Sequence, residues 1–102
     1  MSPRPMRAYL LFMGSGPILL LSTYPKLTDQ RLIEKLRYKG IGKFIAYEVA
    51  LDAVRDRYAD AFENVARDLA GGEDMRVLDF NGHHIMANFS LDKLGDPIKY
   101  GG

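Results

Sequence analysis

The chain has 102 residues, of which 47% are hydrophobic and 26% charged, and its formal net charge is +1. This size and composition predict a single domain over residues 1–102 and exclude a wholly disordered chain. The near-neutral charge argues against nucleic acid as a partner, because duplex-binding domains usually carry a clear basic excess. The absence of cysteine excludes disulfides and thiolate-metal sites.

Residues 1–5 contain prolines and show no apolar period, so we expect them to fray. The apolar residues that follow do not fit a secretory signal, because the Gly- and Pro-containing segment 14–17 divides them and no small-residue cleavage site comes next. No apolar stretch reaches the ~20 residues that a membrane-spanning helix needs. We therefore expect a cytoplasmic protein that does not cross a membrane.

Two strands are predicted first, over residues 6–13 and 18–23. Both segments are apolar without alternation, which is typical of strands that are covered on both faces and lie centrally in a sheet. The short link over 14–17 predicts that the two strands pair as an antiparallel hairpin.

A helix is predicted over residues 29–38, with Thr28 as its N-cap and Gly40 just beyond its last turn. Residues 41–49 fit either a strand or an extension of the next helix. We favour the strand, because β-branched and aromatic residues are dense there and glycines precede them.

The strongest pattern in the chain predicts a long amphipathic helix over residues 52–69, capped by Asp52 and stopped by two glycines. Its apolar residues recur at helical spacing along one stripe. They are Val54, Tyr58, Ala61, Phe62, Val65, Ala66 and Leu69.

The last predicted elements are strands over 75–80 and 84–90, joined by an Asn-Gly pair that is a strong hairpin signal. Residues 95–102 are expected to fray. The predicted order is β-β-α-β-α-β-β, which indicates an α+β (or mixed α/β) fold with a single sheet of about five strands and two helices packed on it.

Three side chains are candidates for acid–base chemistry. Glu48 lies in an otherwise apolar segment, and a buried carboxylate there would be a general-base candidate; the alternative is a solvent-facing or ion-paired glutamate. His83 and His84 flank the predicted turn, but neighbouring strand residues point to opposite faces and do not suit one ion. We therefore predict no metal site.

A small basic cluster is the candidate for anion binding. It consists of Arg37, Lys39 and Lys43 around two glycines. The spacing does not match the phosphate-binding loop, and basic residues are also favourable at a helix C-terminus. Both interpretations stay open from the residues.

The C-terminal pair Gly101-Gly102 resembles the tail of ubiquitin-like proteins and small sulfur carriers. The predicted hairpin followed by a helix also resembles their β-grasp order. The resemblance implies a flexible tail whose terminal carboxylate is adenylated by an activating enzyme. The helix over 52–69 is an element that this order does not contain.

Three functions follow from these observations. We favour a non-catalytic interaction or regulatory protein that forms a homodimer or binds a protein partner, because two helices do not readily cover both apolar faces of five strands. The alternatives are a small-molecule-binding or enzymatic domain with a pocket near Glu48, and a carrier that uses Gly101-Gly102. No complete catalytic motif is present, so an enzyme is not favoured and no cofactor is predicted.

Overall fold

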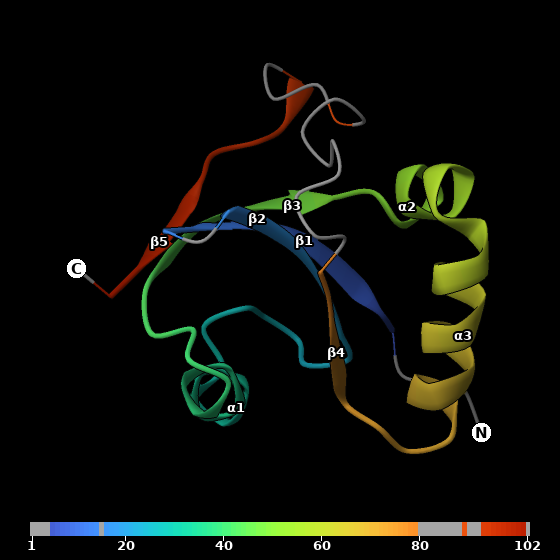
Figure 1. Cartoon of the computed structure of the whole chain (residues 1–102), viewed down its shortest axis with the longest axis horizontal. Coiled ribbons are helices and arrows are strands. Elements are labelled where there is room, and N and C mark those ends of the chain that lie inside the picture. The colour runs from blue at the N-terminus through green and yellow to red at the C-terminus, as the bar shows by residue number, and fades with distance from the viewer. Residues whose placement is uncertain (1–4, 15, 80–88, 90–92, 102) are drawn as a thin grey trace.

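The computed structural model describes residues 5–14, 16–79, 89 and 93–101 (Figure 1). They form one antiparallel sheet with helices, so the predicted α+β fold is confirmed. In chain order the elements are β1 (Arg7–Met13), β2 (Gly16–Ser22), α1 (Gln30–Tyr38), β3 (Phe44–Val49), α2 (Leu51–Arg57), α3 (Ala59–Ala70), β4 (Met75–Leu78) and β5 (Ile98–Tyr100).

The sheet has the strand order β4-β2-β1-β3-β5, and every neighbouring pair is antiparallel. The predicted hairpin is confirmed, because β1 and β2 pair up to Met13 opposite Gly16. Gly16 has φ of 115°, a conformation that glycine adopts without a steric penalty. Strand β1 lies at the centre of the sheet, as its continuous apolar run predicts.

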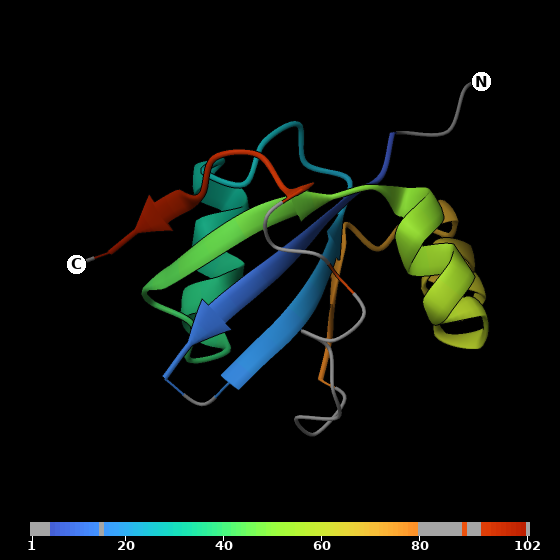
Figure 2. The ribbon, with the colours of Figure 1, turned by 90° about the horizontal axis from the view of Figure 1, so that it is seen from above.

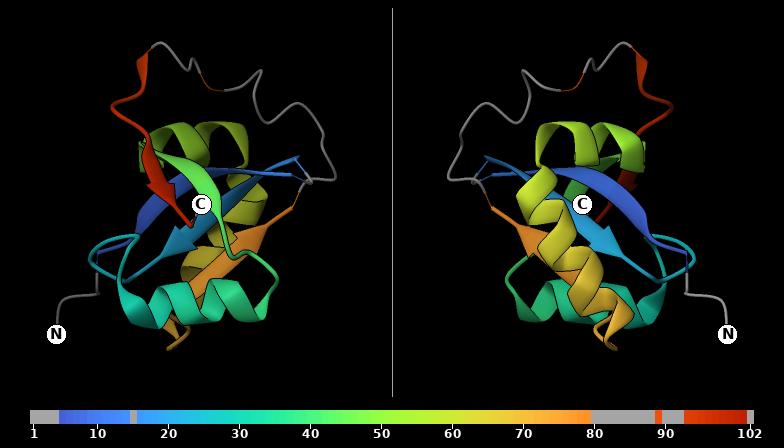
Figure 3. Two further views of the ribbon diagram at one scale, coloured as in Figure 1. Left: turned by 90° about the vertical axis from the view of Figure 1, so that its left-hand side faces the viewer. Right: turned by 90° about the vertical axis from the view of Figure 1, so that its right-hand side faces the viewer.

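Helices cover both faces of the sheet. Helix α1 packs against one face, and α2 and α3 pack against the opposite face, which we call the outer face (Figures 1 and 3). Alternate residues of β1 explain this arrangement, because Tyr9 and Leu11 face α1 whereas Ala8 and Leu10 face α3. The apolar strands are therefore buried within one chain.

The helices differ from the predicted ones at their caps and in number. Asp29 rather than Thr28 caps α1, because its carboxylate accepts a hydrogen bond from the Arg31 backbone N–H at 2.9 Å. The single helix predicted over 52–69 is wrong: Tyr58, at φ −136° and ψ 51°, separates α2 from α3. Ala50 precedes α2 in place of the expected Asp52 cap.

Two backbone hydrogen bonds link Tyr58 to the helices on either side of the break. The Tyr58 N–H donates to Val54 O at 2.8 Å, and the Tyr58 carbonyl accepts from the Phe62 N–H at 2.8 Å. Both Val54 of α2 and Phe62 of α3 are buried against the outer face. No helix in the described part of the chain is long and apolar enough to span a bilayer.

The C-terminal part of the sheet confirms one expectation and corrects another. The strand predicted over 75–80 is observed as β4, whereas the strand predicted over 84–90 lies outside the described residues apart from Phe89. Residues 98–100 were expected to fray with the rest of 95–102. Instead, they pair with β3 as the edge strand β5. The burial of Ile98 and Tyr100 against the α1-side core explains this pairing.

The two ends of the sheet are covered differently. At the closed end, near Arg7, Ser22 and Val49, α3 packs on the outer face. At the open end lie the β1–β2 turn, the start of β3 and the end of β5, away from α2 and α3 (Figures 1 and 2). Among the described helices, only α1 reaches this end.

Candidate binding surface at the open end of the sheet

A hollow of about 470 Å³ lies at the open end of the sheet, and we call it the sheet-end hollow. Three neighbouring strands, β1, β3 and β5, build it, so backbone pairing fixes its walls. Its volume lies in the range of sites that hold small ligands or a few side chains of a partner. The lining residues are Phe12, Met13, Gly14, Lys43, Phe44, Ile45, Lys99, Tyr100 and Gly101.

Aromatic contacts make the lining apolar and rigid. The rings of Phe44 and Tyr100 stack with centroids 5.7 Å apart, which ties β5 to β3. Phe12 meets Tyr47 edge to face at 5.9 Å on the outer face. Beside them, 42% of Ile45 is exposed, one of only two large apolar residues so exposed in the described chain. The other is Tyr38.

Two lysines give the hollow a positive character. Ile45 pairs with Lys99 across β3 and β5, so both side chains project from the outer face. Lys43 lies at the start of β3 on the same hollow. Within the described residues neither Lys43 nor Lys99 has an ion-pair partner. The hollow thus combines an apolar floor with two cations that a carboxylate can approach.

Gly101 closes β5 against the start of β3. Its φ is +71°, and a Cβ atom built on it would collide with the carbonyl oxygen of Gly42 and contact Lys43. The backbone of Gly101 therefore lies directly against these residues, where only glycine fits. A carrier tail needs free and flexible C-terminal residues, and this packing does not favour that alternative. Gly102 lies outside the described residues.

The structure divides the basic cluster that the sequence suggested for anion binding. Arg37 forms an ion pair with Glu34 at 2.9 Å on the surface of α1. Lys39 caps that helix and lines a separate cleft between α1 and residues 72–75. Lys43 alone reaches the sheet-end hollow. The structure adds Lys99, from a distant part of the chain, as its neighbour.

Glu48 is not the buried carboxylate that a general base would require. Its side chain is about half exposed and forms a 3.0 Å ion pair with Arg7 across β1 and β3. This matches the alternative of an ion-paired glutamate on the surface. A shallow hollow of about 400 Å³ lies beside it at the closed end. His83 and His84 lie outside the described residues.

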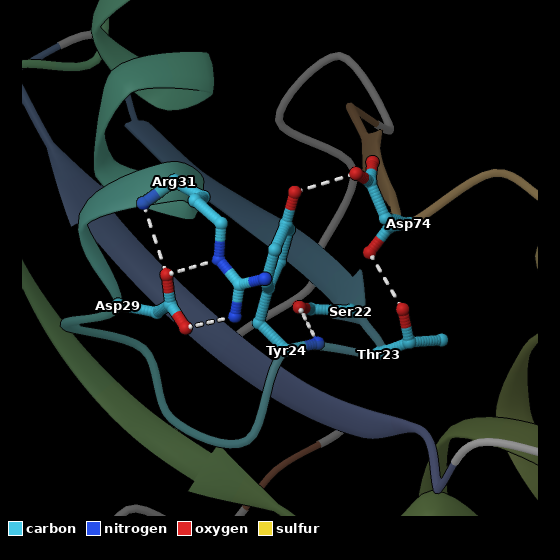
Figure 4. A network of polar contacts seen from close by, with 6 residues as sticks. All are labelled: Ser22, Thr23, Tyr24, Asp29, Arg31 and Asp74. Carbon is cyan, nitrogen blue, oxygen red and sulfur yellow. Dashed lines mark hydrogen bonds and ion pairs between the residues drawn. The ribbon is translucent and has the colours of Figure 1, made fainter.

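A polar network at the closed end joins three elements (Figure 4). The Tyr24 hydroxyl donates to Asp74 Oδ2 at 2.5 Å, and Lys35 Nζ contacts the same carboxylate at 2.9 Å. Thr23 donates its backbone N–H to the Asp74 carbonyl at 3.0 Å. Buried Ser22 accepts the Tyr24 N–H at 2.9 Å. These bonds fasten the β2–α1 loop to the α3–β4 loop.

The electrostatics of this network favour a structural role. Burial and the hydrogen bond to Asp74 raise the pKa of Tyr24, so its phenol stays protonated. Although burial alone would raise the pKa of Asp74, hydrogen bonds from Tyr24 and Lys35 lower it. The hydrogen bond to Asp74 raises the pKa of Lys35. Each group is therefore held in its ordinary ionisation state, the opposite of what a general base or nucleophile needs.

Helix α1 begins beside this network with a second ionic contact. Asp29 accepts from the Arg31 side chain at 2.8 and 3.0 Å (Figure 4). The hydrogen bond from Arg31 lowers the pKa of Asp29 to about 2. The Arg31 guanidinium also lies 5.0 Å from the Tyr24 ring centroid. These contacts organise the start of α1.

Sequence reasoning missed Phe12, Lys99 and Tyr100 as residues of one surface. The alternation of Ile98, Lys99 and Tyr100 was a strand signal, but it is only three residues long. Within the described residues, no three or more His, Asp or Glu side chains are placed to share a metal ion. No known protein family, curated protein or solved structure matches the chain.

Proposed function

We propose that this protein is a non-catalytic interaction domain that binds an acidic, partly apolar segment of a protein partner at the sheet-end hollow. The observation that carries the proposal is the pairing of exposed Ile45 with Lys43 and Lys99 on one surface. The polar network of Tyr24, Lys35 and Asp74 at the closed end supports the fold instead, because its pKa shifts hold each group in its ordinary ionisation state.

An acidic partner suits this surface for two physical reasons. A carboxylate placed between the lysines accepts hydrogen bonds in which both the donor and the acceptor are charged. Apolar side chains of the same segment pack beside Tyr100 at the rim of the hollow, which removes apolar area from water. A partner that contacts both the lysines and the apolar lining gains more binding free energy than a surface ion pair alone provides.

Self-association has less support than the sequence suggested. The apolar runs of β1 and β2 are covered on both sides by helices of the same chain, and Leu10, Leu11, Leu19 and Leu20 are fully buried. Among the described residues, Ile45 and Tyr38 are the exposed large apolar side chains, and Ile45 is flanked by like charges, which oppose pairing of two identical copies across the hollow. A homodimer therefore stays a prediction to be tested by sedimentation.

A peptide titration tests the proposed function. The probe is the synthetic peptide acetyl-Val-Glu-Val-Glu-Val-amide, added to isotope-labelled protein and followed by changes in amide NMR signals. We expect shifts at Ile45, Lys99 and Tyr100, and binding that weakens as salt is added. The counterpart with Lys in place of Glu should produce no such shifts.

Charge reversal provides the matched control. Lys99→Glu should weaken binding of the acidic peptide by about tenfold or more. Lys26→Glu changes the net charge equally but lies on the exposed β2–α1 loop, and it should leave binding unchanged. Equal loss in both variants, or no binding of the acidic peptide to the native protein, would reject the proposal.

A further inference from the structure

The outer edge of β5 provides backbone groups beside the sheet-end hollow. Strand β5 is the last strand in the order β4-β2-β1-β3-β5, so within the described part of the chain its only neighbour in the sheet is β3. Ring stacking of Tyr100 on Phe44 and the close packing of Gly101 hold it in extended form. An edge strand fixed in this way is a template that an extended peptide can join by backbone hydrogen bonds.

The side chains of β5 define what such a peptide must contain. Ile98 and Tyr100 face the α1 side, whereas Lys99 faces outward with Ile45. A residue that pairs opposite Lys99 projects on the same outward face, and its two neighbours project beside Ile98 and Tyr100. An acidic residue flanked by apolar residues therefore matches the edge.

Gly101 extends the same pattern by one step. It lies opposite Lys43, the position after the pair formed by Phe44 and Tyr100. A second acidic residue, two places from the first, would project over Gly101, where no side chain separates it from Lys43. The spacing of the two lysines thus favours carboxylates at alternate positions of an extended peptide.

Lys99 also discriminates between possible partners of this edge. If a second copy of the chain paired with it strand to strand, two Lys99 ammonium groups would come together on one face, and like charges at such positions are destabilising. Edge lysines commonly prevent self-pairing in this way. The same charge attracts an acidic strand, so it selects against a copy and for a partner.

We propose that the acidic partner adds to the sheet as a further strand beside β5, with carboxylates facing Lys99 and Lys43. This inference rests on the proposed function and specifies how the partner binds. Hydrogen bonds come from the peptide backbone, while alternate side chains provide the specificity. The partner is thus an extended segment in which acidic and apolar residues alternate.

Backbone methylation of the peptide probe tests strand addition. Two isomers of N-methylated acetyl-Val-Glu-Val-Glu-Val-amide are compared, one methylated on the backbone nitrogen of its first glutamate and the other on that of its central valine. In a paired strand only alternate N–H groups point toward the neighbouring strand. We expect one isomer to bind about tenfold more weakly or not at all and the other to bind like the parent peptide.

The outcomes separate this inference from the proposed function. If both isomers bind like the parent peptide and Lys99→Glu still weakens binding, the hollow binds acidic segments without backbone pairing, and strand addition is wrong. Loss of binding in both isomers equally overturns it, because pairing uses alternate groups only. If the unmethylated peptide does not bind the native protein, the proposed function fails as well.

Discussion

The two ends of the sheet are made from the same strands but have different surroundings. At the closed end, α3 seals the outer face, and Leu10 and Leu21 are fully buried. At the open end, Ile45 is 42% exposed beside Lys43 and Lys99. The comparison indicates that stability is concentrated at one end, so the other end can present a binding surface with little cost to the fold.

The largest expected effect lies in the closed end. Leu10→Ala should lower the free energy of unfolding by about 2–5 kcal/mol, because it leaves a cavity between β1 and α3. Ile45→Ala at the open end should cost roughly 1 kcal/mol or less, because the side chain is partly in water. Denaturant unfolding measures both, and equal losses would remove the proposed difference between the ends.

Gly101→Ala should act on the open end alone. The left-handed conformation and the collision with Gly42 predict a local loss of about 1–2 kcal/mol and faster amide exchange in β5. Gly14 lines the same hollow, and a Cβ atom added there would meet no atom within 4 Å, so Gly14→Ala serves as the control. Unchanged exchange of Lys99 and Tyr100 in Gly101→Ala would show that β5 does not depend on this packing.

Tyr24→Phe should sharpen the role of the closed-end network. Removal of the donor to Asp74 should cost about 1 kcal/mol at neutral pH. Because the folded-state pKa of Asp74 lies below the ordinary 3.8, its contribution is present above that pH and is lost as pH falls through the folded-state pKa. The difference in the free energy of unfolding between the variant and the native protein should therefore shrink in acid. Parallel pH curves from unfolding measurements would contradict this.

The smallest effect is expected for Glu48→Gln. The Arg7–Glu48 pair is exposed, and breaking it should change the free energy of unfolding by about 0.5 kcal/mol or less. Added salt should shrink even this difference. A loss several times larger in thermal or denaturant unfolding would mean that the carboxylate has a role beyond this surface pair.

Much of the fold could be predicted because local patterns agree with it. The uninterrupted apolar residues of β1 and β2 correctly predict central strands, and the glycine-rich link predicts their hairpin. The break at Tyr58 could not be predicted, since it contains neither proline nor glycine, and it lies between Val54 and Phe62, which are both buried on the same face of the sheet. Strand β5 was missed because its pairing depends on β3, far away in the sequence.

The candidate surface was only partly visible in the sequence for the same reason. Lys43 could be singled out by its neighbours, but its partnership with Lys99 exists only through the register of β3 and β5. Glu48 attracted attention as a carboxylate among apolar residues. Alternation along the strand puts it on the same face as buried Phe44 and Ala46, but it lies near the end of β3 beside Arg7, where its side chain is about half exposed.

The pairing of β3 with β5 has a consequence for how the molecule is made. Strands β1 and β2 are joined by a tight turn and can pair as soon as they are synthesised. The edge of β3 that faces away from β1 stays unpaired until residues 98–100 have been synthesised. During translation that strand is therefore the one exposed to wrong partners, and a ribosome stalled before Ile98 should release a chain that is prone to aggregate.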